Sequence, residues 1–309
     1  MQLRDLWIAV LLDLCLGDPY VFPHPVKGMG RLISLESKVL LKSTRPGHSR
    51  QVAGLLMAVG NIILVAGLVS LLRWALPPLG RHIFDIYGLY ACISARMLHY
   101  EARKVVLALR ESLEAGRQRL RFIVGRDTAE LSQEEILAAT VETVAENTSD
   151  GVVAPLFYTL LFGVVGGYVY KMINTMDSMV GYRNETYEDL GRFPAQIDDL
   201  ANWIPARLTA LLMVLTSIIL GKGKRTAKTV LRDARKHLSP NAGYPESAIA
   251  GWLGIKLGGA HHYFGKLVVK PTIGEKLRAI EESDVTKTIA MMYATLAWML
   301  LITSLLHCL

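Results

Sequence analysis

The sequence predicts an all-α, polytopic membrane protein, and two observations lead to this fold class. Hydrophobic residues make up 51% of the 309 residues and are gathered in runs, whereas an average soluble domain is more polar. Acids, amides and glycines stand at the ends of these runs. Carboxylates close to hydrocarbon are costly and are kept where they are paired, hydrated or bound to a cation. The pattern therefore predicts a membrane-embedded site for charged ligands.

Apolar runs of nearly spanning length recur along the chain. Residues 55–72 form the clearest one, interrupted only by Asn61 and glycines. A full crossing needs about 20 residues, so the shorter runs must borrow flanking residues, tilt or fail to cross. Counting all of them predicts about five membrane segments, with the amphipathic stretch 86–98 as a further candidate. The other runs are residues 6–16, 152–170, 208–220 and 289–306.

The chain carries a net charge of +7, and residues 103–126 and 222–236 supply much of it. Basic segments next to membrane helices are typical of cytoplasmic loops, and a basic amphipathic face can also touch anionic lipid. The charge does not favour nucleic-acid binding, because no groove-reading or stacking motif accompanies it. The glycine–lysine stretch at residues 221–226 lacks the spacing and the preceding strand of a Walker A phosphate-binding loop.

The first polar motif follows the first apolar run and reads Asp18-Pro19-Tyr20-Val21-Phe22-Pro23-His24-Pro25-Val26. Proline fixes φ and restricts the residue before it, so this segment is stiff and kinked. One interpretation is a rigid turn after the first helix. The other is that the prolines hold Asp18 and His24 at the mouth of a site.

The second motif lies at the end of a helix that a capping box at residues 132–135 opens. Glu142 and Glu146 share one face of this helix, which is expected to end soon afterwards in a turn-rich loop. Glu146, Asn147 and Asp150 form either a polar helix cap or a set of oxygen ligands suited to Mg²⁺. The helix dipole opposes an acid in a simple C-terminal cap, and this favours the ligand set.

The third motif has the highest density of polar residues, and Gly181 allows its backbone to turn or to approach a ligand closely. Asp177 stands between two methionines, which favours a site over the alternative of a solvated loop. Arg183 can take a phosphate or a carboxylate through its planar fork. The polar residues of the motif are Asn174, Asp177, Ser178, Tyr182, Arg183 and Asn184.

The fourth motif contains Asp198, Asp199 and Asn202, whose spacing fits a helix with Asp198 and Asn202 on one face. Arg207 follows a proline at the start of the next apolar run. A local ion pair between Arg207 and Asp198 or Asp199 is one interpretation, and such a pair can coexist with ligand binding.

The fifth motif joins a basic segment to a stretch rich in glycine. Ser239, Asn241 and Gly243 belong to a turn-rich loop that is expected to open a helix of small residues, whose free amides could receive an anion. Close helix packing through Gly251, Gly254 and Gly258 is the alternative. Three residues just upstream could bind phosphate, namely Arg235, Lys236 and His237.

The topology of the second and third motifs depends on residues 152–170. If this run and residues 208–220 both cross the membrane fully, the segment 174–207 lies on the opposite side from Asp150. Pro155 and three glycines interrupt residues 152–170, which suits a broken or re-entrant element that lines a polar cavity. We therefore expect such an element.

Taken together, the five motifs resemble those of the CbiB/CobD family of cobalamin-biosynthesis membrane proteins, the adenosylcobinamide-phosphate synthases. The resemblance runs from Asp18 to about Gly265 and includes every motif in the family's order. Residues 1–309 are accordingly expected to form one membrane-embedded domain, integral to the cytoplasmic membrane of a prokaryote. The matching stretches are Asp18 to Val26, Glu146 to Tyr158, Asn174 to Tyr182, Asp198 to Leu208 and Ser239 to Glu246.

The resemblance implies a ligase that forms a carbon–nitrogen bond with ATP as co-substrate and Mg²⁺. The carboxylate of adenosylcobyric acid, a corrinoid, joins the amine of (R)-1-amino-2-propanol O-phosphate, or of ethanolamine phosphate in some relatives. The product is adenosylcobinamide phosphate. The partners implied are these substrates and membrane lipid, together with a second copy of the chain or other cobalamin-pathway enzymes.

Roles can be assigned to the motif residues on this basis. The expected metal ligands are Glu146, Asp150 and Asp177, with Asp198 or Asp199 in support, because Mg²⁺ would neutralise the phosphoryl group in transfer. Asp199 or His237 is the expected base for the attacking amine, and Asp150 and Asp177 complete the catalytic set. The remaining residues are expected to bind ATP or the amine phosphate, namely Asn147, Asn174, Ser178, Arg183, Asn202, Arg207, Lys236 and Asn241.

Two other functions share some of these features. A transporter would also have broken helices and intramembrane acids, but the sequence contains no inverted repeat. A non-catalytic sensor or scaffold of the same superfamily would not need the full set of acids and amides.

Overall fold

The computed structural model describes residues 2–18, 24–182, 184–263 and 265–308 of this mostly helical chain. The chain divides into two compact units, and each is described here by itself. The first unit comprises Met1–Ser94, Ala154–Asn202 and Thr303–Leu309. The second unit comprises Ala95–Val153 and Trp203–Ile302.

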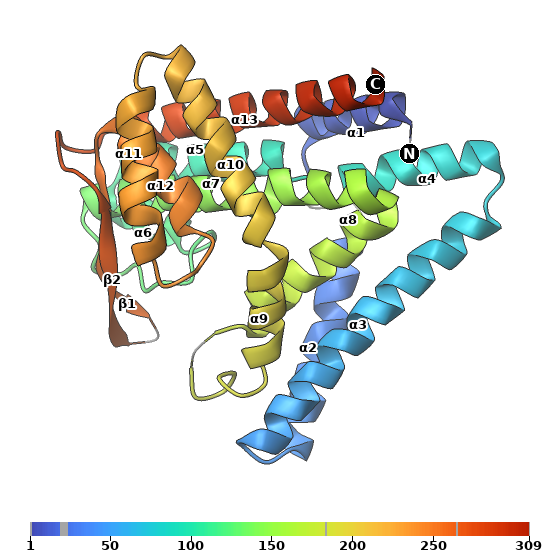
Figure 1. The fold of residues 1–309 in the computed structure, drawn as a ribbon. Helices are drawn as coiled ribbons and strands as arrows, with labels where there is room; N and C mark the ends of the chain where they lie inside the picture. Colours follow the sequence, from blue (N-terminus) through green and yellow to red (C-terminus); the bar gives the residue numbers. More distant parts are fainter. Residues whose placement is uncertain (1, 19–23, 183, 264, 309) are drawn as a thin grey trace. The chain divides into compact units, whose positions relative to one another are not determined.

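The first unit is built around the long helix α8, which packs against α2, α3, α4 and α9 (Figure 1). Helix α1 packs against α4, and α3 also packs against α9. The helices of this unit are α1 (Leu3–Leu16), α2 (Pro25–Ser43), α3 (His48–Ala75), α4 (Pro78–Tyr90), α8 (Ala154–Val180) and α9 (Arg192–Ala201).

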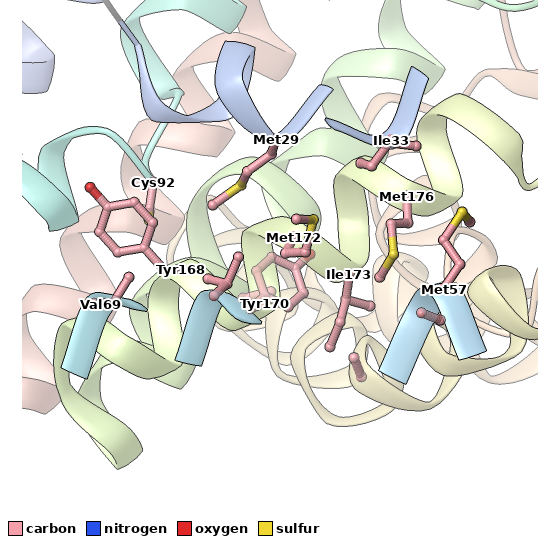
Figure 2. Close-up of a cluster of buried hydrophobic side chains, with 14 of the residues drawn as sticks. Met29, Ile33, Met57, Val69, Cys92, Tyr168, Tyr170, Met172, Ile173 and Met176 are labelled. Atoms are coloured by element: carbon pink, nitrogen blue, oxygen red, sulfur yellow. The ribbon is translucent and has the colours of Figure 1, made fainter. Parts of the chain in front are cut away.

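Methionines and tyrosines fill much of the core of the first unit (Figure 2). Met29 and Ile33 come from α2 and Met57 from α3, and they pack with side chains from the C-terminal half of α8. Methionine is unbranched and polarisable, so it adapts to the irregular spaces between helices that cross. The α8 residues of this cluster are Val164, Tyr168, Tyr170, Met172, Ile173, Met176 and Val180.

Helix α8 is broken at Gly163, as its glycines predicted. Gly163 has φ 67° and ψ −165°, a conformation that is strained for a residue with a Cβ atom. A Cβ atom on Gly166 would lie 2.4 Å from the Tyr158 carbonyl oxygen, so only glycine allows this close approach across the break. The expectation of a broken element is confirmed, and a re-entrant path through the membrane stays a prediction.

The second unit is organised around the short buried helix α12, which contacts α7, α10, α11 and a β-hairpin. Helix α7 continues into a π-helical turn, Ser149–Val153, which packs against α10. The other elements are α5 (Ala95–Glu111), α6 (Leu113–Leu120), α7 (Gln133–Thr148), α10 (Trp203–Ile219), α11 (Gly223–Asp233), a 3₁₀ turn (Ala234–Lys236), α12 (Gly243–Leu253), β1 (Lys256–Tyr263), β2 (Lys266–Gly274) and α13 (Glu282–Cys308), whose last residues belong to the first unit.

The hairpin of β1 and β2 corrects the all-α prediction (Figure 1). The predicted small-residue helix stops at Leu253, because Gly254 adopts the left-handed conformation with φ 74°. Gly258 and Gly259 then lie in β1 with φ values of 77° and 113°, next to an irregularity in the antiparallel register. A Cβ atom on Gly258 would lie 2.5 Å from the Pro271 carbonyl oxygen, so this glycine lets the two strands approach.

The amphipathic stretch 86–98, the further candidate for a membrane segment, is interrupted in the structure. Helix α4 ends at Tyr90 and α5 begins at Ala95.

Among the residues that the structure describes, three helical stretches are long and apolar enough to cross a membrane, namely His48–Ala75, Gln133–Val180 and Glu282–His307. Helices α9 and α10 pass the same test together as a bent pair, which raises the number to four. The prediction of about five segments is therefore not confirmed. Helix α1 has 14 residues and does not pass the test.

Candidate functional site

A buried hydrogen-bonded network in the first unit fixes the Asp198 carboxylate. The Asn202 side-chain amide donates to one Asp198 oxygen at 3.0 Å, and the Asn174 amide reaches the other at 3.5 Å. The Tyr170 hydroxyl donates to the Asn202 side-chain oxygen at 2.9 Å. Asp198, Asn202 and Tyr170 are all buried. Helix α8 and the end of α9 therefore hold this carboxylate in one orientation, and the predicted shared face of Asp198 and Asn202 is confirmed.

The residues Asn174, Asp177 and Ser178 lie on the last turns of α8, so the alternative of a solvated loop is wrong. The Ser178 hydroxyl donates to the Asn174 carbonyl oxygen at 2.8 Å, within the helix. A Cβ atom on Gly181 would lie 2.0 Å from a carboxylate oxygen of Asp177. Only a glycine at 181 allows the Asp177 side chain to lie against the backbone that follows the helix.

Three acids lie close together in this part of the first unit. Asp177 and Asp199 are both near enough to Asp198 to interact with it electrostatically. The structure thus brings together two predicted metal ligands, Asp177 and Asp198, and the predicted base Asp199. Arg183, which was predicted to bind phosphate beside them, lies outside the described residues.

A cavity of about 370 Å³ in the first unit is lined by Asp199, Gly181 and Tyr182 from the predicted motifs. Gln51 and Arg192 also line it. The Arg192 guanidinium donates to the Gln51 side-chain oxygen at 3.4 Å. Sequence reasoning missed Gln51 and Arg192, since neither belongs to a motif. The remaining lining residues are Glu188, Asp189, Gly191, Ala195 and Gln196.

The acids of α7 lie in the second unit, where Glu142 and Arg126 form a buried ion pair. Their side chains are 6% and 5% exposed, and the Gly258 amide donates to the other Glu142 oxygen at 2.8 Å. Glu142 is thus bound by a guanidinium and a backbone amide at once. Arg126 was not predicted to take part, because it is distant from Glu142 in sequence.

Helix α7 starts with the predicted capping box, in which Ser132 and Glu135 bind each other's backbone amides. It does not end in the predicted loop. Asp150 lies in the π-helical turn that joins α7 to α8, and π-turns are often found at functional sites. Asn147 donates to the Thr143 carbonyl oxygen at 3.0 Å, within the helix.

A second buried pair joins His237 to Glu246, with 3.8 Å between the Nε2 atom and the carboxylate. The two side chains are 6% and 5% exposed. The Ser239 amide donates to Nδ1 of His237 at 3.0 Å, and the Ser239 carbonyl oxygen lies 3.3 Å from the same atom. The Nε2 atom faces Glu246. Glu246 lies within the fifth motif but was not assigned a role.

Burial opposes charge on both partners of this pair. Burial, assisted by Glu142 and Glu146, raises the pKa of Glu246 well above its ordinary value. Burial, assisted by the Lys270 ammonium, lowers the pKa of His237. Both shifts favour the neutral forms, a carboxylic acid and an uncharged imidazole, over an ion pair.

Arg207 is held by aromatic rings in the second unit. Its guanidinium carbon lies 4.2 Å from the ring centroid of Trp203 and 4.2 Å from that of Tyr244. It also donates to the Trp203 carbonyl oxygen at 2.6 Å and reaches the Asn241 side-chain oxygen at 3.4 Å. The structure thus brings together two predicted binding residues, Arg207 and Asn241.

Lys236, which is predicted to bind phosphate, is paired with an acid in the structure. Its ammonium donates to Asp233 at 2.7 Å. Asp233 also binds the Arg232 guanidinium and the Gly274 amide. Lys236 therefore contributes to a cluster that ties α11 to the hairpin.

In the first motif, the His24 Nε2 atom lies 3.4 Å from an Asp18 carboxylate oxygen. Asp18 and His24 are thus neighbours, as predicted. The residues between them, 19–23, lie outside the described residues, and so does the predicted stiff turn that they form.

The predicted metal ligands are divided between the units, with Glu146 and Asp150 in the second and Asp177 and Asp198 in the first. Over the described residues, no group of three or more His, Cys, Asp or Glu side chains is arranged to hold a metal ion. All four are oxygen donors, and Mg²⁺ is commonly held by one or two carboxylates together with water and substrate phosphate. The donor chemistry therefore fits Mg²⁺.

Comparison with known proteins gives a family match over nearly the whole chain. Residues 6–292 match the model of the CobD/Cbib protein family. A Cobalamin biosynthesis protein CobD from Clostridium tetani is 42% identical over 309 residues, covering 99% of this chain and 98% of the relative. Its namesake from Geobacter metallireducens is 47% identical over 288 residues, covering 92% and 90%. No solved structure matches the chain.

Proposed function

Since this chain belongs to the CobD/CbiB family and so has a biosynthetic role in cobalamin formation, we propose that it is an ATP-dependent amide ligase. It joins the carboxylate of adenosylcobyric acid to the amine of an amino-alcohol phosphate. ATP transfers its terminal phosphoryl group to the carboxylate and leaves as ADP. The amine then attacks the acyl carbon, a carbon–nitrogen bond forms, and inorganic phosphate leaves.

The observation that carries this proposal is the charge distribution in the cavity of the first unit. An amino-alcohol phosphate bears an ammonium group at one end and a phosphate at the other. The cavity is lined by three acids, Glu188, Asp189 and Asp199, and by one guanidinium, Arg192. The acids are suited to the ammonium end of the substrate and Arg192 to its phosphate. Its volume of about 370 Å³ is in the range of small-molecule sites.

Asp199 is the proposed base in this mechanism. The amine must lose a proton before or during its attack, and a carboxylate within reach can take it. His237 is less suited to this task, since its side chain is buried and its Nδ1 atom is engaged by the backbone of Ser239. Its Nε2 atom faces the Glu246 carboxyl group at 3.8 Å, which is too far for a hydrogen bond.

The residues that would hold Mg²⁺ are Glu146 and Asp150 within the second unit and Asp177 within the first. When bound, the ion neutralises charge on the transferring phosphoryl group and orients it. The side-chain amides of Asn174 and Asn202 fix Asp198. The Asp198 carboxyl group lies close enough to Asp177 to interact with it electrostatically, so it is proposed as the supporting acid of this site. Normal Mg²⁺-dependent turnover by folded Asp150→Asn and Asp177→Asn variants would contradict this assignment.

Arg207 and Asn241 are proposed to bind a phosphate of ATP. The guanidinium already lies between two aromatic rings, so little side-chain freedom remains to be lost when a phosphate binds. Asn147, Asn174, Ser178 and Asn202 are proposed to orient the neighbouring carboxylates and substrates.

Steady-state kinetics of variants in the cavity tests the proposal. Asp199→Asn is expected to lower kcat by about 10²-fold or more. Arg192→Gln is expected to raise KM for the amine phosphate about tenfold while kcat changes less. Glu185→Gln is the matched control, because Glu185 is an exposed acid of the same unit that does not line the cavity. Equal kcat in Asp199→Asn and wild type would refute the proposed base.

A further inference from the structure

A second cavity, of about 440 Å³, lies in the second unit and is lined by residues that follow the end of α10 and by α11. Its lining contains five cationic side chains and one acid. The acid, Glu275, is already paired with Arg232. The cavity therefore carries a strong positive excess that none of the roles above uses. The cationic residues are Lys222, Lys224, Arg225, Lys228 and Arg232.

One wall of this cavity is rigid. The Arg225 guanidinium donates to the carbonyl oxygens of Gly251 and Trp252 at the end of α12, each at 2.6 Å. A Cβ atom on Gly251 would lie 2.7 Å from Thr229, so α11 and α12 pack closely here. Arg225 is thus a fixed positive group that also satisfies the last carbonyl oxygens of a helix.

Two lysines of α11 supply the adjustable positive charge. Lys224 and Lys228 are one helical turn apart and both are exposed. Over the described residues, neither forms a hydrogen bond or an ion pair within the chain. Their ammonium groups are therefore available to an external anion.

The surroundings of the cavity are apolar in a way that favours a lipid. Ile218, Ile219 and Leu220, at and just after the end of α10, are 57%, 72% and 52% exposed. Leu231 of α11 is also exposed. Helix α10 belongs to the bent pair that is apolar enough to cross a membrane. Ile218, Ile219 and Leu220 directly precede the first lining residue, Gly221. Exposed aliphatic side chains beside a group of cations are suited to the boundary between acyl chains and head groups.

We propose that this cavity binds the head-group phosphate of an anionic membrane lipid. Lys224 and Lys228 contact the phosphate, Arg225 forms the fixed wall, and the exposed residues at the end of α10 lie against the acyl chains. The apolar end of α10 and the two lysines are separated by only a few residues. In a lipid, likewise, the phosphate lies close to the start of the acyl chains. A nucleotide phosphate shares the charge but not the acyl chains.

Native mass spectrometry of the purified protein in detergent tests the proposal by measuring the affinity for phosphatidylglycerol. A Lys224→Ala/Lys228→Ala double variant is compared with a Lys256→Ala/Lys266→Ala double variant, which removes two lysines of the hairpin in the same unit. The α11 variant is expected to bind phosphatidylglycerol about 30-fold more weakly than wild type, and the hairpin variant is expected to bind normally. Phosphatidylcholine is expected to bind weakly to all three.

Two results would overturn the proposal. One is equal binding of phosphatidylglycerol by both double variants. The other is binding of ATP that depends on Lys224 and Lys228 and that phosphatidylglycerol does not displace, because the cavity would then be a nucleotide site. Neither measurement depends on turnover, so the proposed ligase activity can fail without affecting this test.

Discussion

Glu142→Gln should destabilise the second unit strongly, because it removes one partner of a buried ion pair. The Arg126 and Glu142 side chains are 5% and 6% exposed, so the guanidinium that remains has little access to water. Breaking a buried pair by removing one partner costs about 3–5 kcal/mol, since the other charge stays buried without compensation. The Gly258 amide keeps a side-chain oxygen as acceptor in the glutamine variant, which places the expected loss at the lower end, about 3 kcal/mol.

The loss can be measured by denaturant unfolding in detergent, with hydrogen exchange of the Gly258 amide as a local probe. A double variant, Arg126→Met/Glu142→Leu, is the control. Replacing both charges by apolar groups of similar size is often neutral or stabilising, so it should recover most of the loss. Gly258 should exchange faster in both variants, and most in the double variant, which lacks an acceptor for this amide. A Glu142→Gln protein as stable as wild type would refute the reasoning that the pair is desolvated.

Three further predictions concern single side chains. Gly181→Ala should lower kcat/KM at least tenfold with little change in the unfolding midpoint, because the new Cβ must displace the Asp177 carboxylate that lies 2.0 Å from its position; unchanged kinetics would argue against a role for Asp177. Tyr170→Phe should destabilise the first unit by about 1–2 kcal/mol in denaturant unfolding, since a buried oxygen of Asn202 loses its donor. Because the pKa of Glu246 is raised in the folded protein, the folded state keeps a proton that the unfolded state releases above about pH 4.5. The free energy of unfolding therefore falls as the pH rises from this value towards the folded-state pKa. Glu246→Gln should therefore flatten the fall in midpoint as the pH rises above 4.5, and an unchanged slope would show that Glu246 is not the group responsible.

The long helices could be predicted from the sequence because their signals are local. The apolar run at residues 55–72 lies within α3, and residues 289–306 lie within α13. The capping box at the start of α7 also depends only on neighbouring residues. Pro155 and the three glycines of residues 152–170 were sufficient to indicate a break in this run, and the structure places it at Gly163.

The errors arose where tertiary contacts decide the outcome. Asn174 and Asp177 are typical of loops, yet they continue α8, where the Asn174 side-chain amide reaches Asp198 of α9. The hairpin was missed since Gly258 and Gly259 were interpreted as small residues of a helix. Their positive φ values and the pairing with β2 follow from contacts that no local pattern encodes.

The sequence predicted many residues of the candidate site, but it did not predict which other residues lie beside them. The five motifs contain Asp199, Asn202 and Arg207, but they give no indication of Arg192 or Gln51 in the cavity. Gln51 lies on α3 and Arg192 at the start of α9, and neither belongs to one of the five motifs. Such proximity depends on the packing of helices, which a single sequence does not reveal.

The central claim is the ligase activity, and mass-spectrometric detection of its product tests it most directly. Purified protein in detergent would be incubated with adenosylcobyric acid, aminopropanol phosphate, ATP and Mg²⁺, with ethanolamine phosphate in a parallel reaction. The account predicts adenosylcobinamide phosphate, and a matching release of ADP, only when ATP and Mg²⁺ are both present. Absence of the amide product from folded protein that binds the corrinoid would contradict the claim that this chain alone is the ligase.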